Sequence, residues 1–253
     1  MTVLLETRNV SKSYGVFRAL DQVTMSVHEG ELVSVVGPNG AGKTTLVNLL
    51  TGLLEPTAGA VLFMGRNIAG VGPVALADHG LARAFQLIQI FPQLTVRETI
   101  GAAVVSRQKK RWRFFARLSA DAEINARAAE VADIFGLGPR LDTVAAALPQ
   151  GEKKLLDVAS AFALDPQVIL LDEPTSGVST SDKHGIMKTL IAAAKRAGVK
   201  AIVLVEHDMD LVAAYSRRII ALSEGQVLAD LPPDRFFADP HLIETVIGRR
   251  KGH

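Results

Sequence analysis

Gly37-Pro38-Asn39-Gly40-Ala41-Gly42-Lys43-Thr44 decides the fold of this 253-residue chain. These residues fit the pattern G-x-x-x-x-G-K-[ST], between a short apolar run at 32–36 and a helical pattern at 43–50. Glycines let a backbone wrap closely around phosphate groups, and the N-terminus of the following helix favours an anion. The stretch therefore predicts a strand, a phosphate-binding loop and a helix, as at the start of an α/β nucleotide-binding domain.

Two side chains of this loop have a predicted role beyond the backbone. The ammonium of Lys43 is expected to contact the β- and γ-phosphates of a nucleotide, and the hydroxyl of Thr44 to ligate Mg²⁺. A glycine-rich turn that matches the pattern by chance is the alternative. The strand before the loop and the helix after it disfavour that alternative.

A second stretch, Val168-Ile169-Leu170-Leu171-Asp172-Glu173, is an apolar strand that ends in two carboxylates. The carboxyl ends of parallel strands share one edge of a sheet, so Asp172 is expected beside the phosphate loop. There Asp172 can hold the Mg²⁺ shell, and Glu173 can position and polarise the attacking water. Taken alone, the pair is an ordinary strand end; together with the loop, it indicates a nucleoside triphosphatase.

The composition agrees with this fold class and limits the others. Apolar residues make up 48% of the chain, and 21 glycines with only 5% aromatic residues suit a parallel α/β architecture better than a β-sandwich. A net charge of +2 does not favour a nucleic-acid binder, and the lack of cysteine excludes disulfides and thiolate metal sites. No apolar run approaches the roughly 18 residues that span a bilayer, so a membrane role requires a partner.

Local patterns place two α/β blocks on either side of a mostly helical stretch at about 90–150. Helices are expected at 43–50, 121–135, 152–164 and 183–197, a further helix from the capping box Thr95-Val96-Arg97-Glu98, and a helical tail at 232–247. Strands are expected at 3–8, 20–27, 32–36, 61–64, 168–171, 201–205, 219–222 and 226–229.

One charge run, residues 107–117, holds six basic residues with Trp112, Phe114 and Phe115 interleaved. It fits a solvated helix end, which we favour, or a surface near lipid headgroups or a membrane partner.

The order of the motifs resembles an ABC transporter nucleotide-binding subunit over nearly the whole chain. The matching positions are Tyr14, Gly37 to Thr45, Gln86, Leu148 to Glu152, Asp172-Glu173 and His207. The details are most similar to the ATP-binding subunits of branched-chain amino acid importers: Ala84-Phe85-Gln86, the basic insert, the run from Glu206 to Val212 and the tail at 239–248. The resemblance implies one domain over 1–253. Its ABC-type P-loop NTPase core, α/β, would cover about 1–88 and 150–253, with an inserted helical lobe at about 89–149 and a small N-terminal β-subdomain.

The resemblance also implies roles for residues that the pattern alone leaves open. Tyr14, in the first loop, would stack on the adenine of ATP, although by itself it fits a surface tyrosine. Gln86 would contact Mg²⁺ or the attacking water, with Gln89 and Gln93 as rivals. His207 would donate a hydrogen bond to the γ-phosphate, although a lone histidine at a strand end is more often structural. Thr45 extends the nucleotide-binding loop.

Leu148-Pro149-Gln150-Gly151-Glu152 occupies the position of the family's signature, usually Leu-Ser-Gly-Gly-Gln, which reaches the ATP of a second subunit. Pro149 replaces the serine and removes a hydroxyl and a backbone donor, and Gln150 replaces the first glycine. The loop at 176–179 lacks the usual aspartate. An intact set of residues for its own ATP beside an altered signature suggests a heterodimer with two unequal ATP sites.

As implied by the resemblance, the partners are integral membrane permease subunits, a second cassette and, indirectly, a substrate-binding protein, with no nucleic acid. The chain would lie at the cytoplasmic face of the inner membrane and energise uptake of branched-chain or other amino acids. Three other classes stay open: a soluble ABC protein acting on DNA or ribosomes, a P-loop kinase or GTPase, and a cassette that binds ATP without hydrolysing it. The region 148–164 and the position of His207 disfavour the second.

Overall fold

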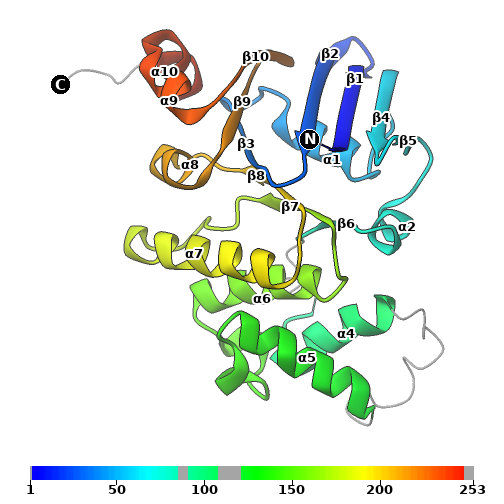
Figure 1. Ribbon diagram of the computed structural model, residues 1–253, viewed down its shortest axis with the longest axis vertical. Coiled ribbons are helices and arrows are strands. Elements are labelled where there is room, and N and C mark those ends of the chain that lie inside the picture. Colours follow the sequence, from blue (N-terminus) through cyan, green and yellow to red (C-terminus); the bar gives the residue numbers. More distant parts are fainter. Residues whose placement is uncertain (1, 85–90, 108–120, 248–253) are drawn as a thin grey trace. The chain divides into compact units, whose positions relative to one another are not determined.

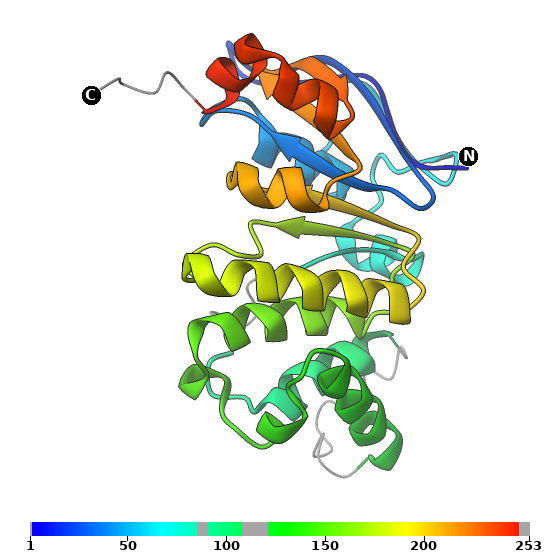
Figure 2. The same ribbon diagram turned by 60° about the vertical axis from the view of Figure 1, so that its left-hand side comes forward.

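The computed structural model describes residues 2–84, 91–107 and 121–247. The chain forms two compact units. Unit 1 consists of Met1–Leu76 with Lys200–His253, and unit 2 consists of Ala77–Val199. The elements of each unit are labelled in Figure 1, and Figure 2 shows them from a second direction.

Unit 1 contains an antiparallel sheet in the order β2-β1-β4-β5. Its strands are β1 (Val3–Tyr14), β2 (Phe17–His28), β4 (Ala58–Phe63) and β5 (Arg66–Asn67). The first two are longer than predicted, because register shifts along the pair let pairing continue to Tyr14 opposite Phe17. A tight turn at Gly15, with φ of +60°, joins them.

The other strands of unit 1 lie in the order β10-β9-β3-β8. They are β3 (Leu32–Val36), β8 (Ala201–Val205), β9 (Arg218–Ser223) and β10 (Gln226–Leu231). β3 pairs in parallel with both β8 and β9, while β10 is antiparallel to β9. Every residue of β3 and β8 is buried, which explains why both strands are continuous apolar runs.

The helices that lie wholly within the described part of unit 1 are α1 (Lys43–Leu50), α8 (Met209–Tyr215), α9 (Pro233–Ala238) and α10 (Pro240–Ile247). The helical tail predicted at 232–247 is confirmed, and it consists of two helices. Asp239 separates them, and its carboxylate accepts hydrogen bonds from the backbone N–H groups of His241 and Leu242. Such capping starts a new helix instead of continuing the old one.

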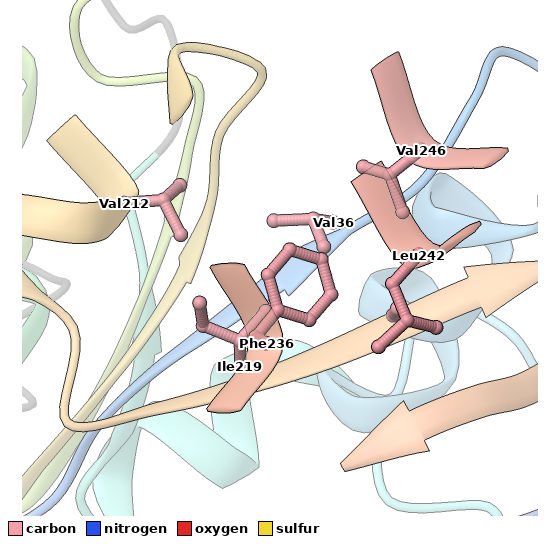
Figure 3. Close-up of a cluster of buried hydrophobic side chains, with 7 residues drawn as sticks. Val36, Val212, Ile219, Phe236, Leu242 and Val246 are labelled. Carbon is pink, nitrogen blue, oxygen red and sulfur yellow. The ribbon is translucent and has the colours of Figure 1, made fainter. Parts of the chain in front are cut away.

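A cluster of buried apolar side chains fastens α9 and α10 to the strand that precedes the phosphate loop (Figure 3). Its members are Val36, Val212, Ile219, Ala221, Phe236, Leu242 and Val246. The ring of Phe236 is fully buried and packs edge-to-face on Phe237, with the ring centroids 5.4 Å apart. Because Val36 is the last residue of β3, this packing fixes the strand that leads directly into Gly37.

Unit 2 pairs β6 (Leu81–Arg83) in parallel with β7 (Val168–Asp172). Its longer helices are α4 (Val96–Arg107), α5 (Ala122–Ile134), α6 (Gln150–Phe162) and α7 (Thr180–Arg196). Short 3₁₀ turns cover Gly138–Arg140 and Ala145–Ala147, and α2 (Pro73–Asp78) spans the boundary between the units. In both ribbon views α6 and α7 run side by side (Figures 1 and 2).

The predicted capping box is confirmed. Thr95 donates its N–H to the Glu98 carboxylate at 2.9 Å, and Glu98 donates its N–H to the Thr95 hydroxyl at 3.2 Å. Asp121 caps α5 by accepting from the N–H groups of Glu123 and Ile124. Among the described residues, no helix combines the length and apolar character that a membrane crossing requires. The division into a core and a helical lobe at 89–149 stays a prediction.

Candidate nucleotide-binding site

The phosphate-loop sequence connects β3 to α1 within unit 1, as predicted. Gly42 is the N-cap residue of α1, in a left-handed conformation with φ of 98°, and no side chain caps the helix. The first N–H groups of a helix lack partners within the helix, and the helix dipole places partial positive charge at this end. The start of α1 is therefore suited to an anion such as a phosphate.

The glycines at 37 and 42 are required by the structure itself. A Cβ added to Gly37 would lie 2.2 Å from the carbonyl oxygen of Leu222, and one added to Gly42 would lie 2.6 Å from that of Ala19. Gly40 has open space around it but a φ of +83°, which other L-residues rarely adopt. Backbone so closely packed and so free of side chains fits the approach of phosphate oxygens.

Lys43 folds back over the loop that it follows. Its ammonium donates hydrogen bonds to the carbonyl oxygens of Gly37, at 2.7 Å, and Pro38, at 2.9 Å, and the residue is only 8% exposed. A buried cation held against the loop backbone is already placed for an anion that enters the same loop. The electrostatics of the loop thus favour a phosphate group.

The other loop residues differ in exposure. Gly37 and Ala41 are buried, Pro38 and Gly42 are half-buried, and Asn39 and Gly40 are exposed at the tip. The side chain of Thr44 is exposed in the first turn of α1, and Thr45 is half-buried. The Thr44 hydroxyl is a hard oxygen donor of the kind that Mg²⁺ prefers.

His207 lies at the same edge of the parallel strands as the loop. β3 and β8 are paired in parallel, with Val35 opposite Val205, so Gly37 and Glu206 both follow the carboxyl ends of their strands. Glu206 is 4% exposed, and its carboxylate accepts the N–H of His207 at 3.1 Å. This bond fixes the backbone that carries an exposed imidazole, at the strand edge where ligands bind to open α/β sheets.

Tyr14 was predicted to lie in a loop, but it is the last residue of β1. Strand pairing continues to this residue because Phe17 lies opposite it. The ring is 48% exposed, with the ammonium of Lys12 5.5 Å from its centroid. An exposed aromatic ring of this kind has a free face on which a base can stack.

Asp172 and Glu173 end β7 in unit 2. One carboxylate oxygen of Asp172, Oδ2, accepts a hydrogen bond from Nη2 of Arg83 at 2.6 Å. The described residues contain no hydrogen bond to its other oxygen, Oδ1, which can thus serve a hard cation. The sequence reasoning missed Arg83, and the only signal for it was a charged residue ending an otherwise apolar strand.

Glu173 has an unusual backbone for a glutamate, with φ of 49°. Non-glycine residues in this left-handed region are uncommon and cost energy, so the surroundings must impose the conformation. Its carbonyl oxygen accepts the N–H of Ser176 at 3.1 Å, which forms a turn directly after the strand. The strand ends at Asp172, and the chain turns at the half-buried Glu173.

The signature segment begins α6 earlier than predicted. The helix starts at Gln150, not at Glu152, because Pro149 takes the N-cap position with a φ of −56° that suits proline. Leu148 is buried, while Glu152 forms a 3.2 Å ion pair with Arg140. No side chain caps α6, so its first N–H groups resemble those of α1 in lacking a side-chain acceptor.

The two segments that depart from the family pattern lie next to each other in unit 2. A Cβ placed on Gly177 would be 3.7 Å from the side-chain nitrogen of Gln150. Nearby, the buried Lys154 donates a hydrogen bond to the Ser176 hydroxyl at 2.8 Å. The signature helix is thereby linked to the loop that follows Glu173, a link that the sequence reasoning missed.

Some predictions fall outside the described residues. Gln86 and its rival Gln89 lie in the segment 85–90, and most of the basic run at 107–117 lies in 108–120. Arg107 ends α4, and Gln93 is exposed in a turn before it.

The glycine-lined phosphate loop lies at the carboxyl edge of parallel strands and leads into a helix that has no side-chain cap. This arrangement defines a P-loop nucleotide-binding protein. Comparison with known proteins gives the family. The family described as ABC transporter matches residues 20–176, more than half of the chain. The chain therefore belongs to the ABC transporter family and is an ATP-binding, ATP-hydrolysing subunit of that class, which confirms the predicted family, fold class and enzyme class.

Individual relatives agree over nearly the full length. The probable branched-chain amino acid transport ATP-binding protein LivG of Archaeoglobus fulgidus is 30% identical, over 97% of this chain and 95% of its own. The high-affinity branched-chain amino acid transport ATP-binding protein LivG of Escherichia coli K12 is 31% identical, over 97% and 98%.

Two solved structures are informative about nucleotide states. An ATP-binding cassette of an ABC transporter in its ADP conformation shares 30% identity and a TM-score of 0.87, over 98% of this chain and 100% of its own. A dimeric cassette in a post-hydrolysis state, bound to ADP and Pi, shares 27% identity and a TM-score of 0.75, over 91% and 99%.

Proposed function

We propose that this chain hydrolyses ATP to energise the uptake of amino acids, branched-chain amino acids foremost, through separate membrane permease subunits. The observation that carries the ATPase part is the uncapped start of α1, with Gly37 and Gly42 excluding side chains and Lys43 held against the loop. The full-length likeness to LivG proteins supports the substrate. The chain would act at the cytoplasmic face of the membrane, with a substrate-binding protein as an indirect partner and no nucleic acid.

We assign the following roles within this proposal. The loop from Gly37 to Thr45 binds the phosphates through backbone N–H groups and Lys43, and Tyr14 stacks on the adenine. Glu173 accepts a proton from the attacking water, which it also positions, while His207 donates a hydrogen bond to the γ-phosphate and Gln86 contacts the water. Thr44, Asp172 and Gln86 would hold Mg²⁺, which when bound neutralises charge on the β- and γ-phosphates.

Force in this mechanism comes from a difference in affinity. ATP can shift a pair of cassettes toward a closed state only by binding that state more tightly than the open one. The trans contact would come from the signature residues Leu148 to Glu152, through the N–H groups at the start of α6. Hydrolysis removes the γ-phosphate and with it the extra affinity of the closed state for the nucleotide.

Uptake measurements test the substrate. In cells that depend on this chain, its replacement by Glu173→Gln is expected to abolish uptake of labelled leucine, isoleucine and valine at equal protein level. Glu29→Gln, the same chemical change at an exposed site, is the control and should leave uptake intact. Unchanged leucine uptake together with loss of another amino acid would overturn the branched-chain assignment alone. Co-sedimentation with ribosomes and no change in any uptake would instead favour a soluble ABC protein.

The altered signature predicts a second, different cassette as partner. Pro149 removes a hydroxyl and a donor from the contact that this chain supplies in trans, whereas its own loop is intact. We expect ATPase activity per site to be low for the purified chain and to rise at least about tenfold when a partner cassette with an intact signature is added, the loss of one charged hydrogen bond being worth roughly that factor. Full, cooperative activity from the chain alone would contradict the heterodimer.

A further inference from the structure

The ion pair between Arg83 and Asp172 is the strongest feature that the proposed mechanism does not use. Nη2 of Arg83 lies 2.6 Å from Oδ2 of Asp172, and the two side chains are only 12% and 24% exposed. A partly buried pair of this kind is shielded from salt, and it affects its surroundings more than a surface pair does.

The strand register explains the pair. Arg83 lies opposite Leu170 in the parallel pairing of β6 with β7, and Asp172 is two residues farther along β7. Residues two apart on a strand point to the same face, so the guanidinium reaches diagonally to the carboxylate. The N–H of Ala84 also donates to the carbonyl oxygen of Leu170 at 3.0 Å, so backbone pairing continues past Arg83 and holds it there.

Charge determines what this arrangement does near a polyphosphate. If ATP binds as proposed, with Asp172 in the Mg²⁺ shell, the ionised carboxylate repels its phosphates unless a cation lies between them or beside the carboxylate. The guanidinium already occupies Oδ2, while Oδ1 has no hydrogen bond within the described part of the chain. Arg83 therefore compensates the charge of Asp172 and leaves one oxygen for a divalent cation.

We propose that Arg83 is a positioning residue for nucleotide binding, whose guanidinium substitutes for the divalent cation at Asp172 whenever ATP binds without Mg²⁺. This inference rests on the proposed ATP site. It predicts that Mg²⁺ contributes only part of the ATP affinity in the wild type. Without Arg83, Asp172 is uncompensated, so Mg²⁺-free ATP binds more weakly while Mg²⁺-ATP binds about as well as before.

The test measures the Kd for ATP in EDTA and the Kd for ATP in saturating Mg²⁺, by equilibrium binding to the full chain. The quantity compared is the ratio of the Kd in EDTA to the Kd in Mg²⁺. For Arg83→Gln the ratio of the two is expected to rise about tenfold or more over the wild type, within the range seen when the partner of a metal ligand is removed. Arg83→Lys keeps the charge and should stay near the wild-type ratio. In the Asp172→Asn background the Arg83→Gln exchange should no longer change the ratio, because the charge to be compensated is gone.

A matched control separates charge compensation from a merely structural ion pair. Arg97→Gln breaks the ion pair with Asp142 elsewhere in unit 2 and should leave the ratio unchanged. If Arg83→Gln lowers the Tm but leaves the ratio at its wild-type value, the pair only fastens β6 to β7 and the inference is wrong. A fall in the ratio would also overturn it. Should the wild type bind no ATP in either condition, the proposed function fails, and the inference fails with it.

Discussion

Lys43→Ala is expected to weaken ATP binding by roughly 10²–10³-fold, which is the worth of one or two charge-assisted hydrogen bonds. The ammonium of Lys43 is held over the loop by the carbonyl oxygens of Gly37 and Pro38. It is thus placed in advance, and little of its interaction with a phosphate is lost to ordering the side chain. Alanine removes the charge, while the backbone of the loop can still form.

Equilibrium binding of ATP to the purified chain measures the effect. Lys188→Ala provides the control, because Lys188 is exposed on α7 and its exchange removes the same charge from a helix. Thermal unfolding of both variants shows whether the fold survives. An unchanged Kd for Lys43→Ala would mean that nucleotide, if it binds, binds elsewhere.

Glu173→Gln is expected to slow hydrolysis by about 10²–10⁴-fold while ATP stays bound, since a positioned general base contributes roughly that factor. Glutamine keeps the size of the side chain and can keep the left-handed turn, but it cannot accept a proton from water. The Arg83–Asp172 pair and the phosphate loop are untouched. Loss of activity should therefore come without loss of affinity.

Analysis of bound nucleotide distinguishes the two effects. After incubation with Mg²⁺ and ATP, the Glu173→Gln protein should retain ATP, whereas the wild type should retain ADP. Glu29→Gln should behave like the wild type. ADP on Glu173→Gln at the wild-type rate would assign the reaction to another group, with His207 the first to examine.

Local sequence signals predicted much of the fold, since a few neighbouring residues determine each of them. The glycine pattern predicted the helix at 43–50 with its bounds, and Thr95 with Glu98 predicted the start of α4. Two boundaries, the break within the helical tail and the start of α6, had signals that were underused. Asp239-Pro240 is a helix-starting pair within the predicted tail, and Pro149 marks the start of α6 more clearly than Glu152 does.

Contacts between distant segments were beyond the sequence reasoning. Arg83 and Asp172 are 89 residues apart, and their pairing depends on the register of two strands that no local pattern encodes. The same holds for Lys154 with Ser176 and for the continued strand at Tyr14, which depends on register shifts between β1 and β2. The roles of the site residues remain predictions.

The most direct test of the central claim is steady-state hydrolysis of Mg²⁺-ATP by the wild-type chain assembled with its membrane partner, with the Lys43→Ala assembly as background. We predict turnover by the wild type and a rate at least about a hundredfold lower for Lys43→Ala, in line with its loss of affinity. A wild-type assembly that binds ATP but turns over no faster than Lys43→Ala would contradict the account, and would mean that this cassette binds ATP without hydrolysing it.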